Sequence, residues 1–257
     1  MNKGPHYRNV FDVDKIRKDF PILERTFNGQ PLIYMDNAAT SLKPQLVIDS
    51  VTDYYRESCA NIHRGVHQLS QESSELYEDA RRKIASFLNA DEEEIVFVRN
   101  ATEALNLISH SLDIQGEIVA TLADHHSVYL PWFDRKQIRY ASLKQTGEID
   151  MDSLRKVVDQ DVGLVCLPHI SNAFGVINPI NEMIELIKRT NALIMLDGSQ
   201  SVPHMMTDVK ELDCDFLVLS GHKMLAPSGI GVLYGKLDLL EKMQPFLKGG
   251  DMNQAVY

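Results

Sequence analysis

The chain has 257 residues, of which 44% are hydrophobic, which is enough for one large α/β domain with a core of its own. Its 36 acidic residues outnumber 26 Lys and Arg, and no long basic cluster interrupts this net charge of -10, so we expect no nucleic-acid partner. The first 20 residues contain no signal-peptide core and no apolar run approaches the ~20 residues that span a bilayer, so we expect a soluble cytoplasmic protein with no membrane partner.

Two helices are predicted before residue 94, at 44–59 and 71–88, because apolar residues recur there at three- and four-residue spacing. From residue 94 onward, short apolar runs alternate with segments of helical period, as in βαβ units. The predicted strands are 94–98, 117–122, 138–143, 163–168, 192–197, 216–220 and 231–234. The predicted helices between them are 102–111, 127–136, 151–160, 181–190 and 209–212. The expected fold class is therefore α/β, with a mainly parallel seven-stranded sheet flanked by helices.

Polar and ionisable residues follow five of the predicted strands. In open α/β sheets the ligand crevice lies outside the carboxyl ends of the strands, so these residues are expected to share one site. They are, in chain order, Asn100, Thr102, His125, Asn172, Asp197, His222 and Lys223.

Lys223 stands in the sequence SGHK at 220–223, directly after the apolar run 216–219. A lysine at the mouth of a sheet can be partly desolvated, so that its neutral amine attacks an aldehyde, although most lysines are surface charges. Asp197 ends another apolar strand, where a carboxylate can pair with the protonated ring nitrogen of an aromatic cofactor. The alternatives for Asp197 are a helix cap or a ligand of a metal or a ribose.

The segment 99–104 joins a strand to a helix, so its first helical amides, at Ala101 and Thr102, can bind a phosphate. Ser220 and His222 could add further donors to the same phosphate. The alternative is an ordinary helix cap with no ligand.

Two histidine-containing loops and one asparagine complete the candidate site. His125 can stack on a planar cofactor or shuttle a proton, whereas the pair His125 and His126 lacks the further ligands that a metal needs. The loop around His63 covers an active site or only caps a helix. Asn172 can hydrogen-bond a cofactor or a substrate carboxylate, or form an Asx turn.

The three cysteines are Cys59, Cys166 and Cys214, an odd number without CxxC or Cys/His spacing. This pattern argues against a disulfide framework and against a zinc site. We expect reduced thiols and no bound metal.

Several longer stretches match one family. The matches run through most of the chain in unbroken order and include YMDNAAT at 34–40, NIHRGVH at 61–67, DHHS at 124–127, DGSQ at 197–200, SGHK at 220–223 and PSGIGVLY at 227–234. On these stretches the chain resembles the SUF-type cysteine desulfurases, which belong to the class V aminotransferase superfamily of fold type I pyridoxal 5'-phosphate (PLP) enzymes. Selenocysteine lyases share the pattern.

The resemblance implies a role for each candidate residue. Lys223 would hold PLP in a Schiff base and later move the Cα proton, and His125 would stack on the ring and take part in catalysis. Asp197 would pair with the pyridine nitrogen and Gln200 with the phenolic oxygen. Other cofactor and substrate contacts would come from Ala101, Thr102, Ser220 and His222 at the phosphate, Asn172 at cofactor or substrate, and His63 at the substrate. Ala101 stands where many relatives have threonine, which removes at most one phosphate contact.

The resemblance also implies an activity and a domain plan. The expected reaction converts L-cysteine to L-alanine in a homodimer and passes sulfur to an acceptor protein, which serves iron–sulfur cluster assembly. Residues 1–30 would belong to a small domain and 31–257 to the PLP-binding large domain. Relatives continue into a C-terminal domain with the sulfur-accepting cysteine, and its absence here predicts weak turnover. The alternatives are another class V enzyme (selenocysteine lyase, C–S lyase, epimerase or aminotransferase) and a non-catalytic module.

Overall fold

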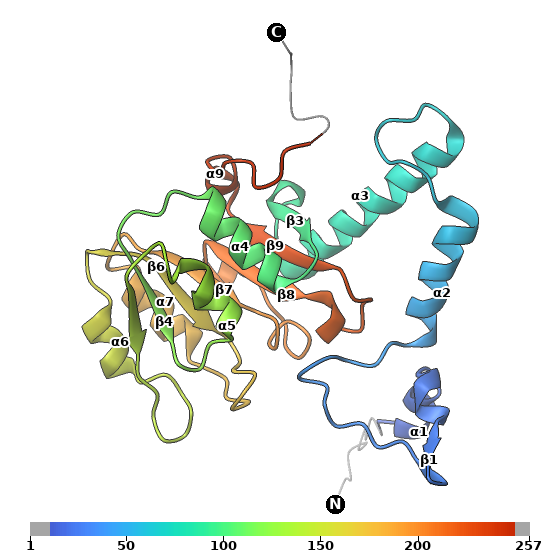
Figure 1. Ribbon diagram of the computed structural model, residues 1–257, viewed down its shortest axis with the longest axis horizontal. Coiled ribbons are helices and arrows are strands. Elements are labelled where there is room, and N and C mark those ends of the chain that lie inside the picture. Colours follow the sequence, from blue (N-terminus) through green and yellow to red (C-terminus); the bar gives the residue numbers. More distant parts are fainter. Residues whose placement is uncertain (1–10, 250–257) are drawn as a thin grey trace, which may run out of the picture.

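A seven-stranded sheet forms the centre of the computed structural model, which describes residues 11–249 (Figure 1). In chain order its strands are β3 (Ile95–Val98), β4 (Glu117–Thr121), β5 (Ile138–Ala141), β6 (Val162–Pro168), β7 (Leu193–Asp197), β8 (Phe216–Ser220) and β9 (Gly231–Gly235). The spatial order is β3-β9-β8-β7-β6-β4-β5. Only β9 runs against its neighbours, pairing antiparallel with β3 and β8, and all other pairs are parallel. The predicted α/β class and mainly parallel sheet are confirmed.

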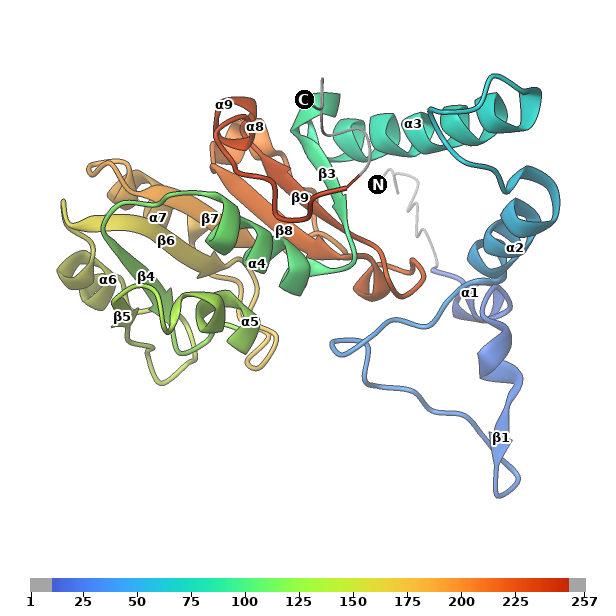
Figure 2. The same ribbon diagram turned by 45° about the horizontal axis from the view of Figure 1, so that its top comes forward.

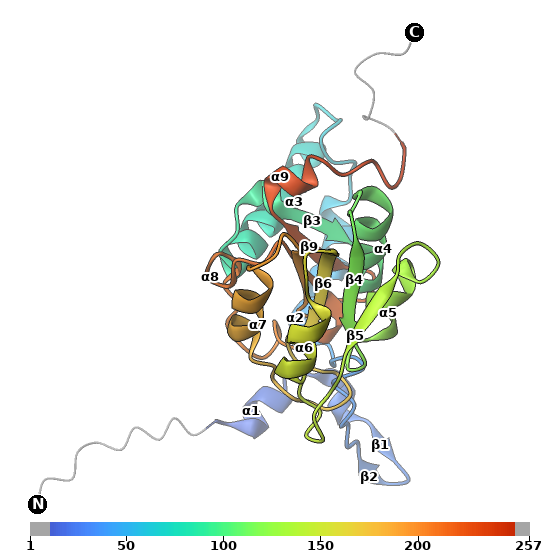
Figure 3. The same cartoon turned by 90° about the vertical axis from the view of Figure 1, so that its left-hand side faces the viewer.

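Helices cover both faces of the sheet (Figure 3). One face carries α4 (Ala101–Ser111), α5 (His126–Tyr129) and α9 (Leu237–Leu240). The other face carries α3 (Gln68–Leu88), α6 (Met151–Val157), α7 (Ile180–Ile187) and α8 (Val209–Leu212). Because successive strand residues point to opposite faces, Leu164 and Cys166 of β6 lie in the core on the face that carries α4, while Val165 and Leu167 lie in the core on the face that carries α7. Covering on both faces explains why the central strands are continuous apolar runs.

The predicted helix at 127–136 is wrong. In its place α5 ends at Tyr129 and a 3₁₀ turn follows at Leu130–Trp132. Pro131 has no N–H to donate to a preceding carbonyl, so an α-helix cannot continue through it. The predicted helix at 44–59 is split into α2 (Gln45–Asp53) and a π-helical turn at Tyr54–Ser58.

An N-terminal arm stands apart from the sheet (Figure 2). It consists of α1 (Val13–Arg17), a 3₁₀ turn at Pro21–Glu24, the hairpin of β1 (Thr26–Phe27) with β2 (Gln30–Pro31), and α2. Sequence reasoning did not predict the hairpin, although its turn is the pair Asn28 and Gly29, both with positive φ (51° and 74°) as a two-residue hairpin requires. The domain division at residue 30 stays a prediction, and residues 1–10 and 250–257 of the two predicted segments lie outside the described residues.

Candidate active site

A cavity of about 370 Å³ opens at the carboxyl ends of β3, β4, β6, β7 and β8. It is the place where an open α/β sheet binds its ligand. The residues that line it are Ala38, Ala39, Asn100, Ala101, Thr102, His125, Ser127, Asn172, Asp197, Ser199, Ser220, His222 and Lys223. The cavity therefore gathers nearly all of the site residues expected from the sequence.

Gln200 and His63 are the two predicted site residues that do not line this cavity. The Gln200 amide donates to the carbonyl of Ala38 (2.7 Å), so Gln200 holds a residue that lines the cavity without lining it itself. His63 lies in the loop before α3, where its Nε2 is 3.3 Å from a carboxylate oxygen of Glu78 and its ring meets Tyr77 edge-on. The predicted substrate contact of His63 therefore stays a prediction.

The N-terminus of α4 forms one wall of the cavity. Asn100 caps the helix through its side chain, which accepts from the Glu103 N–H (2.9 Å), and the Ala101 N–H donates to Ser220 Oγ (2.9 Å). Within the described residues the Thr102 N–H has no such partner, so it remains available to a ligand. The helix start thus offers a free donor and the positive end of its dipole to an anion.

Gly231 lets β9 pass close under this helix start. A Cβ at Gly231 would lie 2.7 Å from Asn100 Cα and 2.7 Å from the Leu219 carbonyl oxygen, closer than real Cβ contacts occur. Glycine at this position therefore sets how near α4 approaches the sheet.

Lys223 lies on a 3₁₀ turn, Gly221–Lys223, that continues directly from β8. Its side chain is half-buried and lines the cavity. Beside it, burial lowers the pKa of His222, and the Lys223 and Lys43 cations lower that pKa further. His222 is therefore a neutral imidazole at neutral pH.

Two acids lie near the cavity. Asp197 is half-buried, lines the cavity, and accepts a hydrogen bond from the Ser199 N–H through Oδ1 (2.9 Å). Asp124 is 7% exposed, and burial above all, together with the charge of Asp197, raises its pKa to about 8. Asp124 therefore keeps its proton at neutral pH, because burial penalises the charged form of its carboxyl.

His125 presents an exposed ring at the mouth of the cavity. It caps α5: the Ser127 N–H donates to Nδ1, and Ser127 Oγ lies 2.7 Å from the same nitrogen. With Nδ1 accepting, a neutral His125 carries its proton on Nε2.

Sequence reasoning assigned no role to four lining residues, Ala38, Ala39, Ser127 and Ser199. Ser127 and Ser199 stand beside His125 and Asp197, so their proximity to predicted site residues was a usable signal. Ala38 and Ala39 come from the N-terminal segment, follow no strand of the large sheet, and carry no reactive group. No chemical signal in the sequence identifies them.

None of the three cysteines lines the cavity. Cys166 and Cys214 are buried, and burial raises the pKa of both thiols, that of Cys214 to about 12. Cys59 is exposed at the end of the π-helical turn. Within residues 11–249 no group of three or more His, Cys, Asp or Glu side chains is arranged to hold a metal ion.

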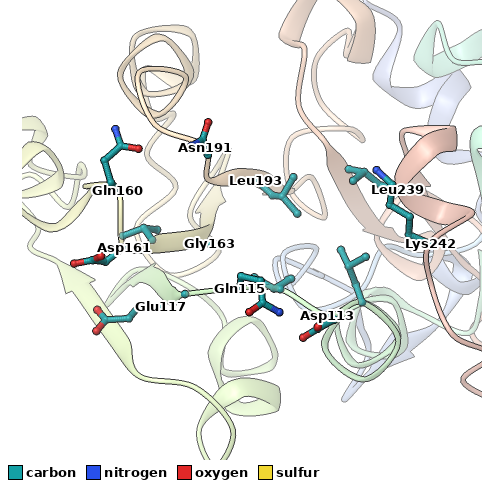
Figure 4. A pocket seen from close by; sticks show the side chains of 14 residues that line it. Asp113, Gln115, Glu117, Gln160, Asp161, Gly163, Asn191, Leu193, Leu239 and Lys242 are labelled. Carbon is teal, nitrogen blue, oxygen red and sulfur yellow. The ribbon is translucent and has the colours of Figure 1, made fainter.

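A second and larger hollow of about 680 Å³ lies at the opposite, amino ends of β4, β6 and β7 (Figure 4). Its charged side chains are Asp113, Glu117, Asp161 and Lys242, and it contains no histidine or cysteine. Volume alone therefore does not identify the active site, because the reactive groups lie at the other end of the sheet.

The model of the Aminotransferase class-V family matches residues 33–257. The chain belongs to this family. Among curated relatives, a probable cysteine desulfurase of Halobacterium salinarum is 44% identical over 257 residues, covering 95% of this chain and 62% of the relative. The chain thus spans about three fifths of the length of most of these curated relatives and 40% of one, the cysteine desulfurase of Synechococcus elongatus.

Two solved structures of cysteine desulfurases are similar to this chain. The apo structure of a cysteine desulfurase from Thermococcus onnurineus NA1 has a TM-score of 0.87 and 36% identity, covering 95% of this chain and 62% of that one. The cysteine desulfurase CsdA of Escherichia coli has a TM-score of 0.84 and 34% identity, covering 97% of this chain and 64% of that one.

In the described part of this chain, no helix is both long and apolar enough to cross a membrane.

Proposed function

We propose that this class V chain binds PLP through Lys223 and supports a cysteine desulfurase reaction, in which L-cysteine becomes L-alanine and sulfur passes to an acceptor. The observation that carries this proposal is the meeting of Lys223, Asp197 and the N-terminus of α4 in one cavity. The similarity to proteins named cysteine desulfurase, at 41–45% identity, supports the choice of reaction.

The residues present fit PLP in three respects. A lysine at the cavity can bond to an aldehyde, and an acid at the same cavity can pair with a ring nitrogen. The free Thr102 amide at the start of α4, together with Ser220 and His222, matches a phosphate. Ala101 has no side-chain donor and its N–H is taken by Ser220 Oγ, so its proposed part in the phosphate site is to line the cavity.

Bound PLP would supply an electron sink for the carbanion left when the substrate loses its Cα proton. The chain's own residues would do the rest. Lys223 Nζ would take and return that proton, and the charge of Asp197 would keep the facing ring nitrogen protonated. The exposed His125 ring would stack on the cofactor, and Asn172 would hydrogen-bond the cofactor or the substrate carboxylate.

The sulfur acceptor is proposed to be a group other than the three cysteines at their described positions. Cys166 and Cys214 are inaccessible with raised thiol pKa values, and Cys59 lies outside the cavity. An acceptor protein, a homodimeric state, a part in iron–sulfur cluster assembly and a cytoplasmic location remain predictions of the same proposal.

The first prediction tests the reaction. Addition of L-cysteine, together with a small dithiol that can accept the sulfur, to the PLP-loaded chain should change its visible spectrum and form L-alanine, because the proposed role of Lys223 and Asp197 is removal of the Cα proton. Alanine is measured by amino-acid analysis. The Lys223→Ala variant should form none, whereas Lys242→Ala, just after α9 at the other end of the sheet, should match the wild type. Equal alanine from the wild type and Lys223→Ala would overturn the proposed function.

A further inference from the structure

The carbonyl oxygen of His222, the residue before Lys223, accepts four hydrogen bonds from one short segment far away in sequence. We name residues 38–43 the strap. The donors are Ser41 N (2.9 Å), Ser41 Oγ (3.0 Å), Thr40 Oγ1 (3.0 Å) and Lys43 Nζ (2.8 Å). A carbonyl oxygen has two lone pairs, so four donors are more than it ordinarily accepts.

The strap is tied to the cavity at two further points. Ser41, which is 8% exposed, accepts through Oγ from the Leu225 N–H (2.8 Å), just beyond Lys223. Leu225 has φ of 70°, a left-handed conformation that a leucine keeps only where its surroundings impose it. At the strap's other end the Gln200 amide holds the Ala38 carbonyl. Hydrogen bonds from the strap thus hold the residue just before Lys223, His222, and the residue two positions after it, Leu225. We call this set of hydrogen bonds the clamp.

Lys43 differs from the other donors because it brings a charge. Its Nζ also donates to the Ser41 carbonyl (2.6 Å), and it forms no ion pair with a carboxylate among the described residues. Burial lowers the pKa of this ammonium group. A partly buried cation held only by carbonyl and hydroxyl oxygens is costly, which points to a role at the neighbouring turn.

We propose that Lys43 is a positioning residue for Lys223. Its ammonium group binds the His222 carbonyl, fixes the turn Gly221–Lys223, and so aims the Lys223 side chain into the cavity. The inference rests on the proposed role of Lys223. A strap that serves stability alone would tolerate loss of the charge as long as the aliphatic stem remained.

Two measurements on three variants separate these cases. Lys43→Met keeps the stem and removes the charge, Lys43→Arg restores a cationic donor, and Lys242→Met removes a lysine from an exposed i,i+4 pair with Asp238 as the matched control. The first measurement is the rate at which added PLP gives a visible band that borohydride removes. The second is hydrogen exchange of residues 221–226 in the PLP-free protein, whose amides at Met224 and Ala226 bond to Gly221 O.

Lys43→Met should slow covalent attachment by about tenfold and speed exchange in 221–226, since a hydrogen bond from a charged donor is removed. Lys43→Arg should recover most of the rate, and Lys242→Met should match the wild type. Equal rates and equal exchange in Lys43→Met and the wild type would overturn the inference, as would loss without recovery in Lys43→Arg.

The exchange measurement does not need PLP, so it judges the clamp even where the proposed function fails. A wild type that takes up no PLP contradicts the proposed function, while faster exchange in Lys43→Met still supports the clamp. Where Lys43→Met does not fold, Thr40→Val removes one donor to the same carbonyl and should speed exchange in 221–226 to a smaller extent. Unchanged exchange in a folded Thr40→Val would count against the clamp.

Discussion

Asp124 is the residue whose protonation the fold changes most clearly. Its pKa rises from 3.8 to about 8 because the carboxyl is buried, and its Oδ1 has no hydrogen-bond partner within the described residues. The native protein therefore binds a proton between about pH 4 and pH 8 that the unfolded chain releases. The free energy of unfolding should fall as pH rises through that window, by up to about 1.4 kcal/mol per pH unit.

This residue gives the second testable prediction. Asn keeps an acceptor for the Thr121 N–H but cannot ionise, so Asp124→Asn should gain stability relative to the wild type as pH rises from 5 to 8. The measurement is urea unfolding of both proteins at both pH values, with the exposed Asp238→Asn as control. A difference between Asp124→Asn and the wild type that is the same at pH 5 and pH 8 would show that Asp124 is not protonated in the native state.

At the residue scale, prediction from sequence succeeded where a reactive side chain follows an apolar run. Lys223, Asp197 and His125 fall into this class because their strands end at the same edge of the sheet. A search for reactive side chains after apolar runs cannot detect Ala38, whose contribution to the cavity comes from its position on the strap. It also cannot foresee that the Gln200 amide points to a backbone carbonyl.

At the scale of elements, the distance between α4 and β9 determines the geometry of the proposed phosphate site. The α4 start passes directly over Gly231, and any side chain there would push against the backbone of Asn100 and Leu219. Backbone atoms cannot rotate out of the way as a flexible side chain can, so either the helix start or the strand must move.

The third prediction follows from that contact. Gly231→Ala should lower the free energy of unfolding by about 1–3 kcal/mol through overpacking, and it should weaken PLP binding because the Thr102 amide is displaced. Chemical unfolding and a PLP titration measure the two effects. Gly249→Ala, where a Cβ meets nothing within 4 Å, should change stability by less than about 0.5 kcal/mol. Normal stability and normal PLP affinity in Gly231→Ala would refute the proposed role of this approach.

The strands were predictable because both faces of the sheet are covered, which requires apolar runs with recognisable ends. β8 has the predicted bounds, Phe216–Ser220. The order of strands was not predictable, and neither was the reversal of β9, because pairing depends on contacts between distant segments. The break after α5 follows from Pro131, a local signal that helical periodicity alone does not weigh.

At the scale of the whole molecule, the site is assembled from three parts of the chain. The sheet brings five strand ends together, α4 adds a helix start, and the strap returns from the N-terminal arm to clamp the Lys223 turn. The bonds between the strap and His222 link residues about 180 positions apart, so no local pattern predicts them. The class V resemblance includes the stretches 34–40 and 220–223, but it does not indicate that they are in contact.

The central claim is that Lys223 is the lysine that holds PLP. Its most direct test is borohydride reduction of the PLP-loaded protein, followed by proteolysis and mass measurement of the peptides. The account predicts a reduced pyridoxyl group on Lys223 and on no other lysine. A protein that carries this group on Lys43 or on another lysine, or that carries none after exposure to PLP, would contradict it.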